Sequence, residues 1–303
     1  MKVCVLDLGT NTFNLLVADI KGKSFEVLAQ DKIGVRIGEN GFGKKIITKE
    51  AMERGLLGFE SLLNQAKHHG AEKYIALATS ALRDADNAKE FLALVREKFQ
   101  VEIEIITGRQ EAEFIYRGVA LSGVLMATSP SLIMDIGGGS TQFVIGNSEE
   151  LIWLESTSLG AARLKELFKP SDPIKDEELA QIQSYIQTHL IELQRAITEN
   201  KTQQLVGSSG SFDSLVDMLS YPEKQSTKGT YNPIKYQDLI SLLDKLIYST
   251  KEERLAMKGL ITLRVDFIVL ASILIKEVLK ITQIREISQC AYSLKEGALF
   301  HKN

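Results

Sequence analysis

The sequence predicts an α/β fold of two similar domains, each with a mixed sheet flanked by helices. Three observations support this prediction. Apolar segments typical of strands alternate with amphipathic segments typical of helices. The stretch CVLDLGTNTFNLLVAD, residues 4–19, matches LIMDIGGGSTQFVIGN, residues 132–147. The chain has 303 residues, 44% of them hydrophobic, which is enough for two separate cores.

The duplicated stretch indicates a hairpin that binds an anion. It aligns Asp7 with Asp135 and Gly9 with Gly137, and both copies read as strand, tight turn and strand. A Walker A loop or a dinucleotide-binding turn places its glycines between a strand and a helix, whereas residues after these two turns continue as strand. The backbone N–H groups of such a turn can instead surround phosphate oxygens as an anion-binding nest.

The rest of the first half alternates in type. β-branched and apolar runs predict strands, and longer amphipathic stretches predict helices. We expect strands at residues 25–30, 73–79 and 101–107, and helices at about 48–69, 86–99 and 110–121.

The second half begins again after a junction near residues 122–131. We expect strands at 131–136, 151–157, 203–206 and 285–291, and helices at about 161–168, 175–199, 211–219, 236–247 and 260–281. The apolar stretch 267–275 is well short of the roughly 20 residues of a membrane-spanning helix, so we interpret it as part of a buried helix.

Composition excludes several classes of protein. The net charge of -3 provides no overall attraction to nucleic acid or to a membrane surface, so we expect neither as a partner. The N-terminal apolar run is too short for a signal peptide, which predicts a cytoplasmic protein. Cys4 and Cys290 lie in or beside expected strands and suit reduced, buried thiols. The four histidines lack the spacing of zinc ligands.

Asp7 and Asp135 each come near the end of an apolar strand, where an unpartnered carboxylate is costly to bury. A hydrated Mg²⁺ ion bound to phosphate is one partner, because Mg²⁺ prefers carboxylate and phosphate oxygens. The alternative is that each aspartate only caps its own turn. The duplication favours the ligand role.

Three further features are candidates for chemistry. Glu111 opens a helix directly after a strand, at the sheet edge where ligands bind in open α/β folds, although the helix dipole alone also favours glutamate there. Arg83 follows another strand and is either a phosphate clamp or a surface arginine. The stretch GSSGS, residues 207–211, joins a strand to a helix and forms either a second anion site or an ordinary turn.

Seven motifs in order resemble the exopolyphosphatase and guanosine pentaphosphate phosphatase (Ppx/GppA) family. This family is a branch of the superfamily that contains actin, sugar kinases and heat-shock ATPases. The motifs are DLGTNTFNLLV, ATSALRDADN, ITGRQEAEFIYRG, MDIGGGSTQFVIG, SLGAARL, VGSSGS and SLKEGAL. The resemblance implies two actin-like (ribonuclease H-like) domains with the active site in the cleft between them. Residues 1–122 with about 292–303 would form the first domain, and residues 123–291 the second.

The resemblance also implies residue roles. Glu111 matches the glutamate that orients or deprotonates the attacking water, Asp135 the metal-linked aspartate, and Arg83 a phosphate-binding arginine. Asp7 would share the Mg²⁺ ion with Asp135. The phosphate-binding residues would be Asp7, Thr10, Asn11, Thr12, Gly137, Gly138, Gly139, Ser140, Thr141, Gly207, Ser208, Ser209 and Gly210.

Three positions depart from the pattern of many family members. Gln142 stands in place of an acidic residue, Asn14 in place of an arginine or histidine, and Lys295 in place of an arginine. Gln142 removes a carboxylate that could help to hold metal or water, and Asn14 removes a cation from the path of the phosphate. These changes predict a slow enzyme or a different phosphorylated substrate.

The leading hypothesis is a Mg²⁺-dependent hydrolase that releases terminal orthophosphate from inorganic polyphosphate. The alternatives are a guanosine pentaphosphate 5′-phosphatase or a low-activity sensor of guanosine penta- or tetraphosphate. An ATP-dependent kinase of the same superfold ranks last. The sequence leaves open the choice of substrate, the preferred polymer length and the oligomeric state, for which a homodimer is one alternative.

Overall fold

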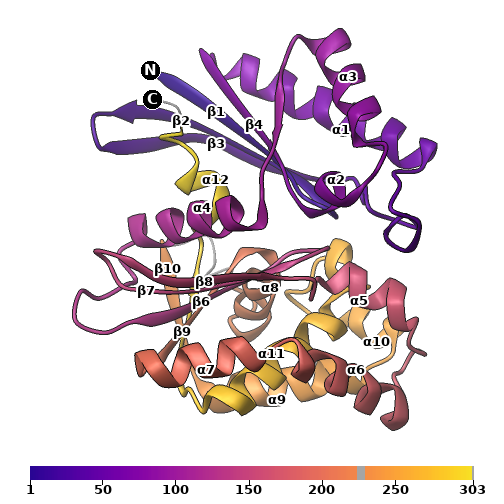
Figure 1. Cartoon of the computed structure of the whole chain (residues 1–303), viewed down its shortest axis with the longest axis vertical. Helices are drawn as coiled ribbons and strands as arrows, with labels where there is room; N and C mark the ends of the chain where they lie inside the picture. The colour runs from indigo at the N-terminus through magenta and orange to yellow at the C-terminus, as the bar shows by residue number, and fades with distance from the viewer. Residues whose placement is uncertain (224–228, 302–303) are drawn as a thin grey trace. The chain divides into compact units, whose positions relative to one another are not determined.

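A computed structural model describes residues 1–223 and 229–301 of the chain (Figure 1). The chain divides into two compact units. Unit 1 comprises Met1–Gly118 and Leu294–Asn303, and unit 2 comprises Val119–Ser293. Each unit holds a mixed sheet flanked by helices, so the predicted fold class is confirmed.

The sheet of unit 1 has five strands in the order β3-β2-β1-β4-β5. Strand β1 (Lys2–Leu8) pairs antiparallel with β2 (Thr12–Lys21), which pairs antiparallel with β3 (Ser24–Gly34). On its other side β1 runs parallel to β4 (Lys73–Ala78), and β4 runs parallel to β5 (Ile103–Ile105). The carboxyl ends of β1, β4 and β5 therefore share one edge of the sheet.

The helices of unit 1 connect and cover these strands. They are η1 (Phe42–Lys44), α1 (Lys49–His68), α2 (Ser80–Asp84), α3 (Ala88–Phe99), α4 (Gly108–Leu121, which continues into unit 2) and α12 (Leu294–Gly297). Helix α1 begins where the Thr48 hydroxyl accepts a hydrogen bond from Ala51 N, a favourable N-cap. Its apolar residues pack with α3 on the sheet, as Phe59 and Phe91 in the same core show.

The sheet of unit 2 has six strands in the order β10-β11-β9-β6-β7-β8. Strands β6 (Ser131–Ile136), β7 (Thr141–Gly146) and β8 (Leu151–Thr157) form an antiparallel meander, as β1, β2 and β3 do in unit 1. Strands β9 (Gln204–Ser208) and β11 (Glu286–Cys290) continue parallel to β6. Strand β10 (Tyr231–Ile234), which we did not predict, closes the far edge.

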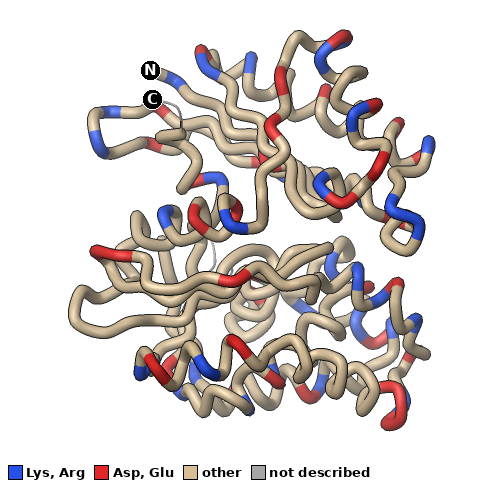
Figure 2. Tube along the Cα trace, in the orientation of Figure 1, with Lys and Arg blue, Asp and Glu red and all other residues tan. Residues whose placement is uncertain are grey.

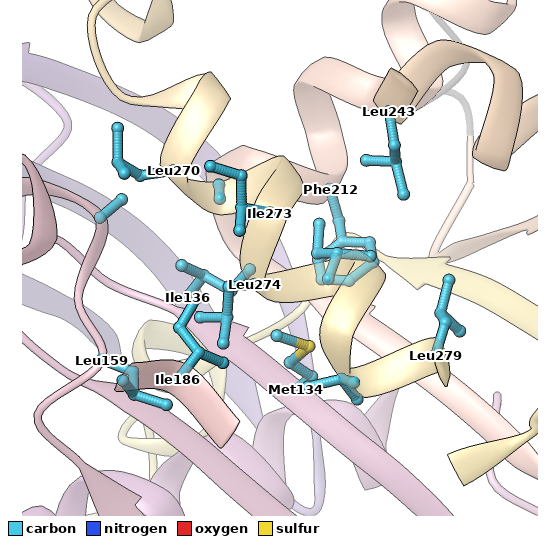
Figure 3. Close-up of a cluster of buried hydrophobic side chains, with 14 of the residues drawn as sticks. Met134, Ile136, Leu159, Ile186, Phe212, Leu243, Leu270, Ile273, Leu274 and Leu279 are labelled. Carbon is cyan, nitrogen blue, oxygen red and sulfur yellow. The ribbon is translucent and has the colours of Figure 1, made fainter. Parts of the chain in front are cut away.

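Helices surround this second sheet. They are α5 (Ala161–Phe168), α6 (Asp176–Thr188), α7 (Ile191–Asn200), α8 (Ser209–Leu219), α9 (Tyr236–Tyr248), α10 (Lys251–Ala256), η3 (Thr262–Arg264) and α11 (Ile268–Thr282). Helix α11 contains most of the apolar stretch 267–275 and is buried along nearly its whole length, which confirms the buried helix expected there. Its Leu274 and Leu279 lie in a core with Met134, Phe212 and Leu243 (Figure 3).

Alternation along the strands determines where the two aspartates lie. Leu132, Met134 and Ile136 of β6 belong to the core of unit 2, so Asp135 points from the opposite face. In β1, Leu6 and Leu8 belong to the core of unit 1, and Asp7 between them points away from it in the same manner. Charged residues lie mainly on helices and loops, whereas the central strands are mostly uncharged (Figure 2).

Two expected helices were wrong in extent. The helix expected at 175–199 is two helices, α6 and α7, because the Thr188 hydroxyl donates to Tyr185 O and His189 Nδ1 contacts the same carbonyl. Side chains that compete for backbone groups in this way end helices. The helix expected at 260–281 begins only at Ile268, because residues 262–264 form the short 3₁₀ turn η3.

The C-terminal helix α12 fits against α4 because Gly297 lacks a side chain. A Cβ at Gly297 would lie 1.8 Å from Phe114 O and 2.7 Å from Gly118 N. Next to it, the buried Glu296 accepts from Gln30 Nε2 at 3.3 Å and pairs with Lys295 Nζ at 2.9 Å. Lys295 therefore keeps the positive charge that an arginine would supply beside this carboxylate.

Within the described residues, every helix is too short or too polar to cross a membrane. Both cysteines are buried and reduced. Burial raises the pKa of the Cys4 thiol to about 12, so this thiol is protonated at neutral pH.

The contact between α12 and α4 generates a stability prediction. We expect Gly297→Ala to destabilise the protein by roughly 1–3 kcal/mol or more, because the new methyl group overlaps a backbone carbonyl that cannot move without α4. Urea unfolding measures the change. Gly229→Ala is the matched control, since a Cβ there meets only Tyr231 O at an ordinary 3.7 Å. Equal midpoints for the two variants would contradict this packing role.

Candidate functional site

The turn between β1 and β2 is held so that its N–H groups remain available. Gly9 N donates to Thr12 O at 3.0 Å and closes the turn. The carbonyls of Thr10 and Asn11 accept hydrogen bonds from backbone N–H groups of residues 35–38. Because a peptide's carbonyl and N–H point in opposite directions, these bonds turn N–H groups of the loop toward the other side. The turn thus has the construction of an anion-binding nest.

Asp7 pairs with the residue directly opposite it on the hairpin. Asp7 and Asn14 are register partners, and Asn14 Nδ2 donates to Asp7 Oδ2 at 2.8 Å. Asn14 therefore orients the carboxylate without supplying a positive charge.

The clearest charged pair in unit 1 joins Arg83 of α2 to Glu111 in the first turn of α4. Arg83 Nη1 lies 2.8 Å from Glu111 Oε2 and also donates to Ile106 O at 3.0 Å. Glu111 is buried, with 6% of its surface exposed, whereas the Arg83 side chain is 21% exposed. The arginine thus fixes the carboxylate while it keeps an edge toward solvent. These two predicted residues come from separate helices that follow the parallel strands β4 and β5.

The turn between β6 and β7 repeats the construction of the first turn. Gly137 N donates to Ser140 O at 2.9 Å, as Gly9 does to Thr12. The carbonyls of glycines 137–139 accept hydrogen bonds from residues 161–163 at the start of α5. Within the described part of the chain, the N–H groups of Gly138 and Gly139 donate to no protein acceptor. They are available to an anion.

Asp135 is the acceptor for three serine hydroxyls. Ser208 Oγ donates to Asp135 Oδ2 at 2.6 Å, and Ser293 Oγ donates to the same oxygen. Ser209 Oγ donates to Oδ1 at 2.9 Å. These hydroxyls come from β9, from the start of α8 and from the segment after β11, so the carboxylate ties three elements of unit 2 together. Ser209 takes a left-handed backbone conformation, with φ 62°, which the bond to Asp135 helps to hold.

Gln142 is the register partner of Asp135, but its amide is directed elsewhere. Gln142 Nε2 donates to Ser140 Oγ at 2.9 Å and to Ser156 Oγ at 3.2 Å. The side chain is buried. The position where the family resemblance suggests a carboxylate therefore carries a neutral donor that contacts Ser140 of the β6–β7 turn.

Arg264 lies over the start of α8, where Gly210 makes room for it. A Cβ at Gly210 would lie 1.8 Å from Arg264 Nη2. Among the described residues, the buried Nε of Arg264 has no hydrogen-bond partner. Burial lowers the pKa of Arg264 below the ordinary range of arginine, whereas the charges of Asp213 and Asp135 raise it. The guanidinium thus brings a positive charge to residues 208–210, at the start of α8 beside Asp135.

The segment that carries Arg264 is held by Arg254, which is buried. Arg254 Nε donates to Val265 O at 3.0 Å, and its Nη1 donates to Ser249 O. Its Nη2 forms an ion pair with Asp172. Arg254 therefore fixes the backbone directly after Arg264.

The structure places most of the predicted residues at the turns and helix starts described above. Thr10, Asn11 and Thr12 lie at the β1–β2 turn, Ser140 at the β6–β7 turn and Gly207 at the end of β9. The hydroxyl of Thr141, predicted to bind phosphate, donates to Leu159 O at 2.8 Å. Phosphate binding by these residues stays a prediction.

Three residues of the site were missed from the sequence. Ser293 is the first residue of the SLKEGAL motif, and Arg163, whose Nε donates to Gly139 O at 2.7 Å, lies in SLGAARL. Both motifs belong to the family resemblance, which implies no role for these two residues. Arg264 is the single basic residue in the apolar stretch ITLRVDF, and no motif marks it.

The family resemblance implies a Mg²⁺ ion, for which Asp7 and Asp135 are the expected ligands. A carboxylate offers about four acceptor positions, and the serines occupy three of those of Asp135. Asp135 therefore fits a cation whose other ligands are water and phosphate, but not a cage of protein ligands. In agreement, no cluster of three histidine, cysteine or acidic side chains with ligand geometry occurs in residues 1–223 and 229–301. Metal binding by Asp7 and Asp135 stays a prediction.

The two sheets and their matching turns give the chain a duplicated, actin-like architecture. The model of the Ppx/GppA phosphatase family matches residues 16–303. The chain belongs to the Ppx/GppA phosphatase family.

Individual relatives agree with this membership. The chain is 26% identical to exopolyphosphatase 1 of Mycobacterium tuberculosis over 304 residues, which cover 100% of the chain and 88% of that protein. The crystal structure of an exopolyphosphatase from Cytophaga hutchinsonii is 37% identical, with a TM-score of 0.95, over 99% of this chain and 97% of that one. A Ppx/GppA family member from Aquifex aeolicus, 24% identical over 99% of this chain and 96% of its own, shares the fold with a TM-score of 0.80.

The close approach of Gly210 to Arg264 generates a binding prediction. We expect Gly210→Ala to displace the guanidinium and to weaken pyrophosphate binding about tenfold or more, since a hydrogen bond to a charged group contributes roughly 1.5–3 kcal/mol. Isothermal titration calorimetry with pyrophosphate measures the change. Gly229→Ala should bind pyrophosphate as the wild type does. Unchanged binding by Gly210→Ala would remove Arg264 from the anion site.

Proposed function

We propose that this protein is an exopolyphosphatase, which hydrolyses the terminal phosphoanhydride bond of inorganic polyphosphate. The observation that carries the proposal is the pair of turns whose carbonyls are held by other segments, together with the Arg83–Glu111 pair. Membership of the Ppx/GppA phosphatase family and the similarity to proteins named exopolyphosphatase support it.

Unit 1 supplies the group that activates water. The Glu111 carboxylate accepts a proton from the attacking water molecule, and the ion pair with Arg83 holds this carboxylate in one orientation. The exposed edge of Arg83 donates to a phosphate oxygen. The N–H groups of Asn11 and Thr12 in the β1–β2 turn, which the hydrogen bonds to the preceding carbonyls orient, add neutral donors for phosphate.

Unit 2 binds the phosphoryl groups. The N–H groups of Gly138 and Gly139, the Ser140 hydroxyl and the Arg264 guanidinium are donors for their oxygens. Asp135 orients the hydroxyls of Ser208 and Ser209 at the start of α8.

The reaction needs little covalent assistance from the protein. Water attacks the terminal phosphorus, the bond to the bridging oxygen breaks, and orthophosphate leaves with a chain shorter by one unit. Phosphoryl transfer depends on positioning and on neutralising charge on the transferred oxygens, which fixed N–H groups and arginines supply. A Mg²⁺ ion, when bound to the phosphates, neutralises further charge. A cytoplasmic location, the absence of nucleic-acid and membrane partners, and a homodimeric state stay predictions.

A second candidate function is a guanosine pentaphosphate phosphatase or a low-activity sensor of guanosine penta- or tetraphosphate. Asn14 and Gln142 favour it, because both positions opposite the aspartates carry neutral amides. Phosphate release measured side by side on polyphosphate, guanosine pentaphosphate and ATP distinguishes these functions. Tight calorimetric binding of the nucleotide without phosphate release would support the sensor.

The role of Glu111 gives a kinetic prediction. Glu111→Gln keeps the size of the side chain but removes the base, so we expect kcat on polyphosphate to fall roughly 10²–10⁴-fold with little change in KM. Orthophosphate release measures both constants. Glu113→Gln on the same helix is the control, because Glu113 pairs with the exposed Arg109 and this variant should leave kcat unchanged. A Glu111→Gln enzyme with full kcat would exclude Glu111 as the base.

The role of Arg264 predicts the opposite pattern. Arg264→Ala removes a phosphate donor, so we expect KM for polyphosphate to rise about tenfold or more, since hydrogen bonds to charged groups contribute roughly 1.5–3 kcal/mol. The exposed Arg195 provides the control variant Arg195→Ala, which should keep the wild-type KM. If both variants shift KM equally, the effect is one of net charge and not of this site.

A further inference from the structure

The residue opposite Asp135 determines how many carboxylates this hairpin can offer to a cation. Gln142 is the register partner of Asp135, so the two side chains lie on the same face of adjacent strands. A glutamate there would place a second carboxylate beside the first. Gln142 is neutral instead, and both N–H bonds of its amide go to the hydroxyls of Ser140 and Ser156 and not to Asp135.

Most of the hydrogen-bond acceptor positions of the Asp135 carboxylate are taken by donors of the protein itself. Three serine hydroxyls donate to its two oxygens, and all three donors come from unit 2. A cation bound in advance would have to displace these hydroxyls or share the one remaining acceptor position. Mg²⁺ is held in proteins by one or two carboxylates together with substrate phosphates and retained waters. Without a second carboxylate, the phosphates must supply most of the ligands.

The charge around Asp135 also opposes a resident cation. Arg264 lies over the start of α8, and its charge interacts with that of Asp135. Ser140 accepts a hydrogen bond from Gln142, so its own proton is directed toward another acceptor, such as a phosphate oxygen. The surroundings of Asp135 are thus built from donors, which attract an anion and repel a free cation.

We propose that this protein binds its divalent cation as a complex with polyphosphate, and that Gln142 is the residue that prevents a resident metal ion. The inference rests on the proposed function, because it concerns how that substrate enters the same site. The species that binds is polyphosphate already carrying Mg²⁺. Between turnovers these residues would hold no cation of their own, because the phosphates would supply most of its ligands.

Direct metal binding tests the proposal without any turnover. Electron paramagnetic resonance with Mn²⁺ as the probe measures binding to the protein alone and in the presence of methylenediphosphonate, which is not hydrolysed. We expect the wild type to bind Mn²⁺ only when methylenediphosphonate is present. Gln142→Glu should bind Mn²⁺ alone at least about tenfold more tightly than the wild type, because affinity rises with the number of charged ligands.

The variant is suited to this test because it preserves the local hydrogen bonds. Glutamate has the size of glutamine, and the hydroxyls of Ser140 and Ser156 can donate to it where they now accept. The control is Gln181→Glu, which makes the same change of charge at an exposed position of α6. It should bind Mn²⁺ no more tightly than the wild type.

Two results would overturn the proposal. One is tight, stoichiometric Mn²⁺ binding by the wild type alone that Asp135→Asn abolishes. The other is Mn²⁺ binding by Gln142→Glu that equals that of the wild type. Failure of the proposed function would give a different result. The protein would then release no orthophosphate from polyphosphate at any Mg²⁺ concentration. Its Mn²⁺ binding could still depend on methylenediphosphonate.

Discussion

The availability of backbone N–H groups in the two hairpin turns is the constraint on which the proposed site depends. A turn whose carbonyls faced the ligand would repel phosphate. In unit 2 the start of α5 donates to the carbonyls of glycines 137–139, and in unit 1 residues 35–38 donate to those of Thr10 and Asn11. Each turn is therefore oriented by a segment that lies more than 20 residues from it in the sequence. Because that segment binds the carbonyls of the turn, the N–H groups face the opposite direction.

Each unit contains a buried carboxylate that is held by partners from other segments. Glu111 is fixed by Arg83, and Asp135 is fixed by three serine hydroxyls. Both carboxylates have partners that limit their movement, which compensates for the loss of water around them. The difference lies in the partner: the cationic Arg83 pairs with Glu111, whereas three neutral hydroxyls donate to Asp135.

Much of the fold could be predicted from local patterns. Helices at residues 161–168 and 236–248 and the strands that carry both aspartates follow from periodicity and from the repeat. The expected helix at 175–199 failed, because the hydrogen bonds of Thr188 and His189 that end α6 depend on side-chain geometry that periodicity does not report. Arg264 was missed for a related reason, since its position over Gly210 depends on η3 and Arg254.

The sequence by itself determined the two matching hairpins, because the alternation of apolar residues and the glycines at the turns are local properties. It also determined that neutral amides stand at positions 14 and 142. Only the tertiary structure decided what these groups contact. Asn14 donates a hydrogen bond to Asp7, whereas Gln142 donates to Ser140. Asp135 instead accepts hydrogen bonds from Ser208, Ser209 and Ser293. The physical reason is that a hydrogen bond between distant segments depends on how strands and helices pack, which no single segment specifies.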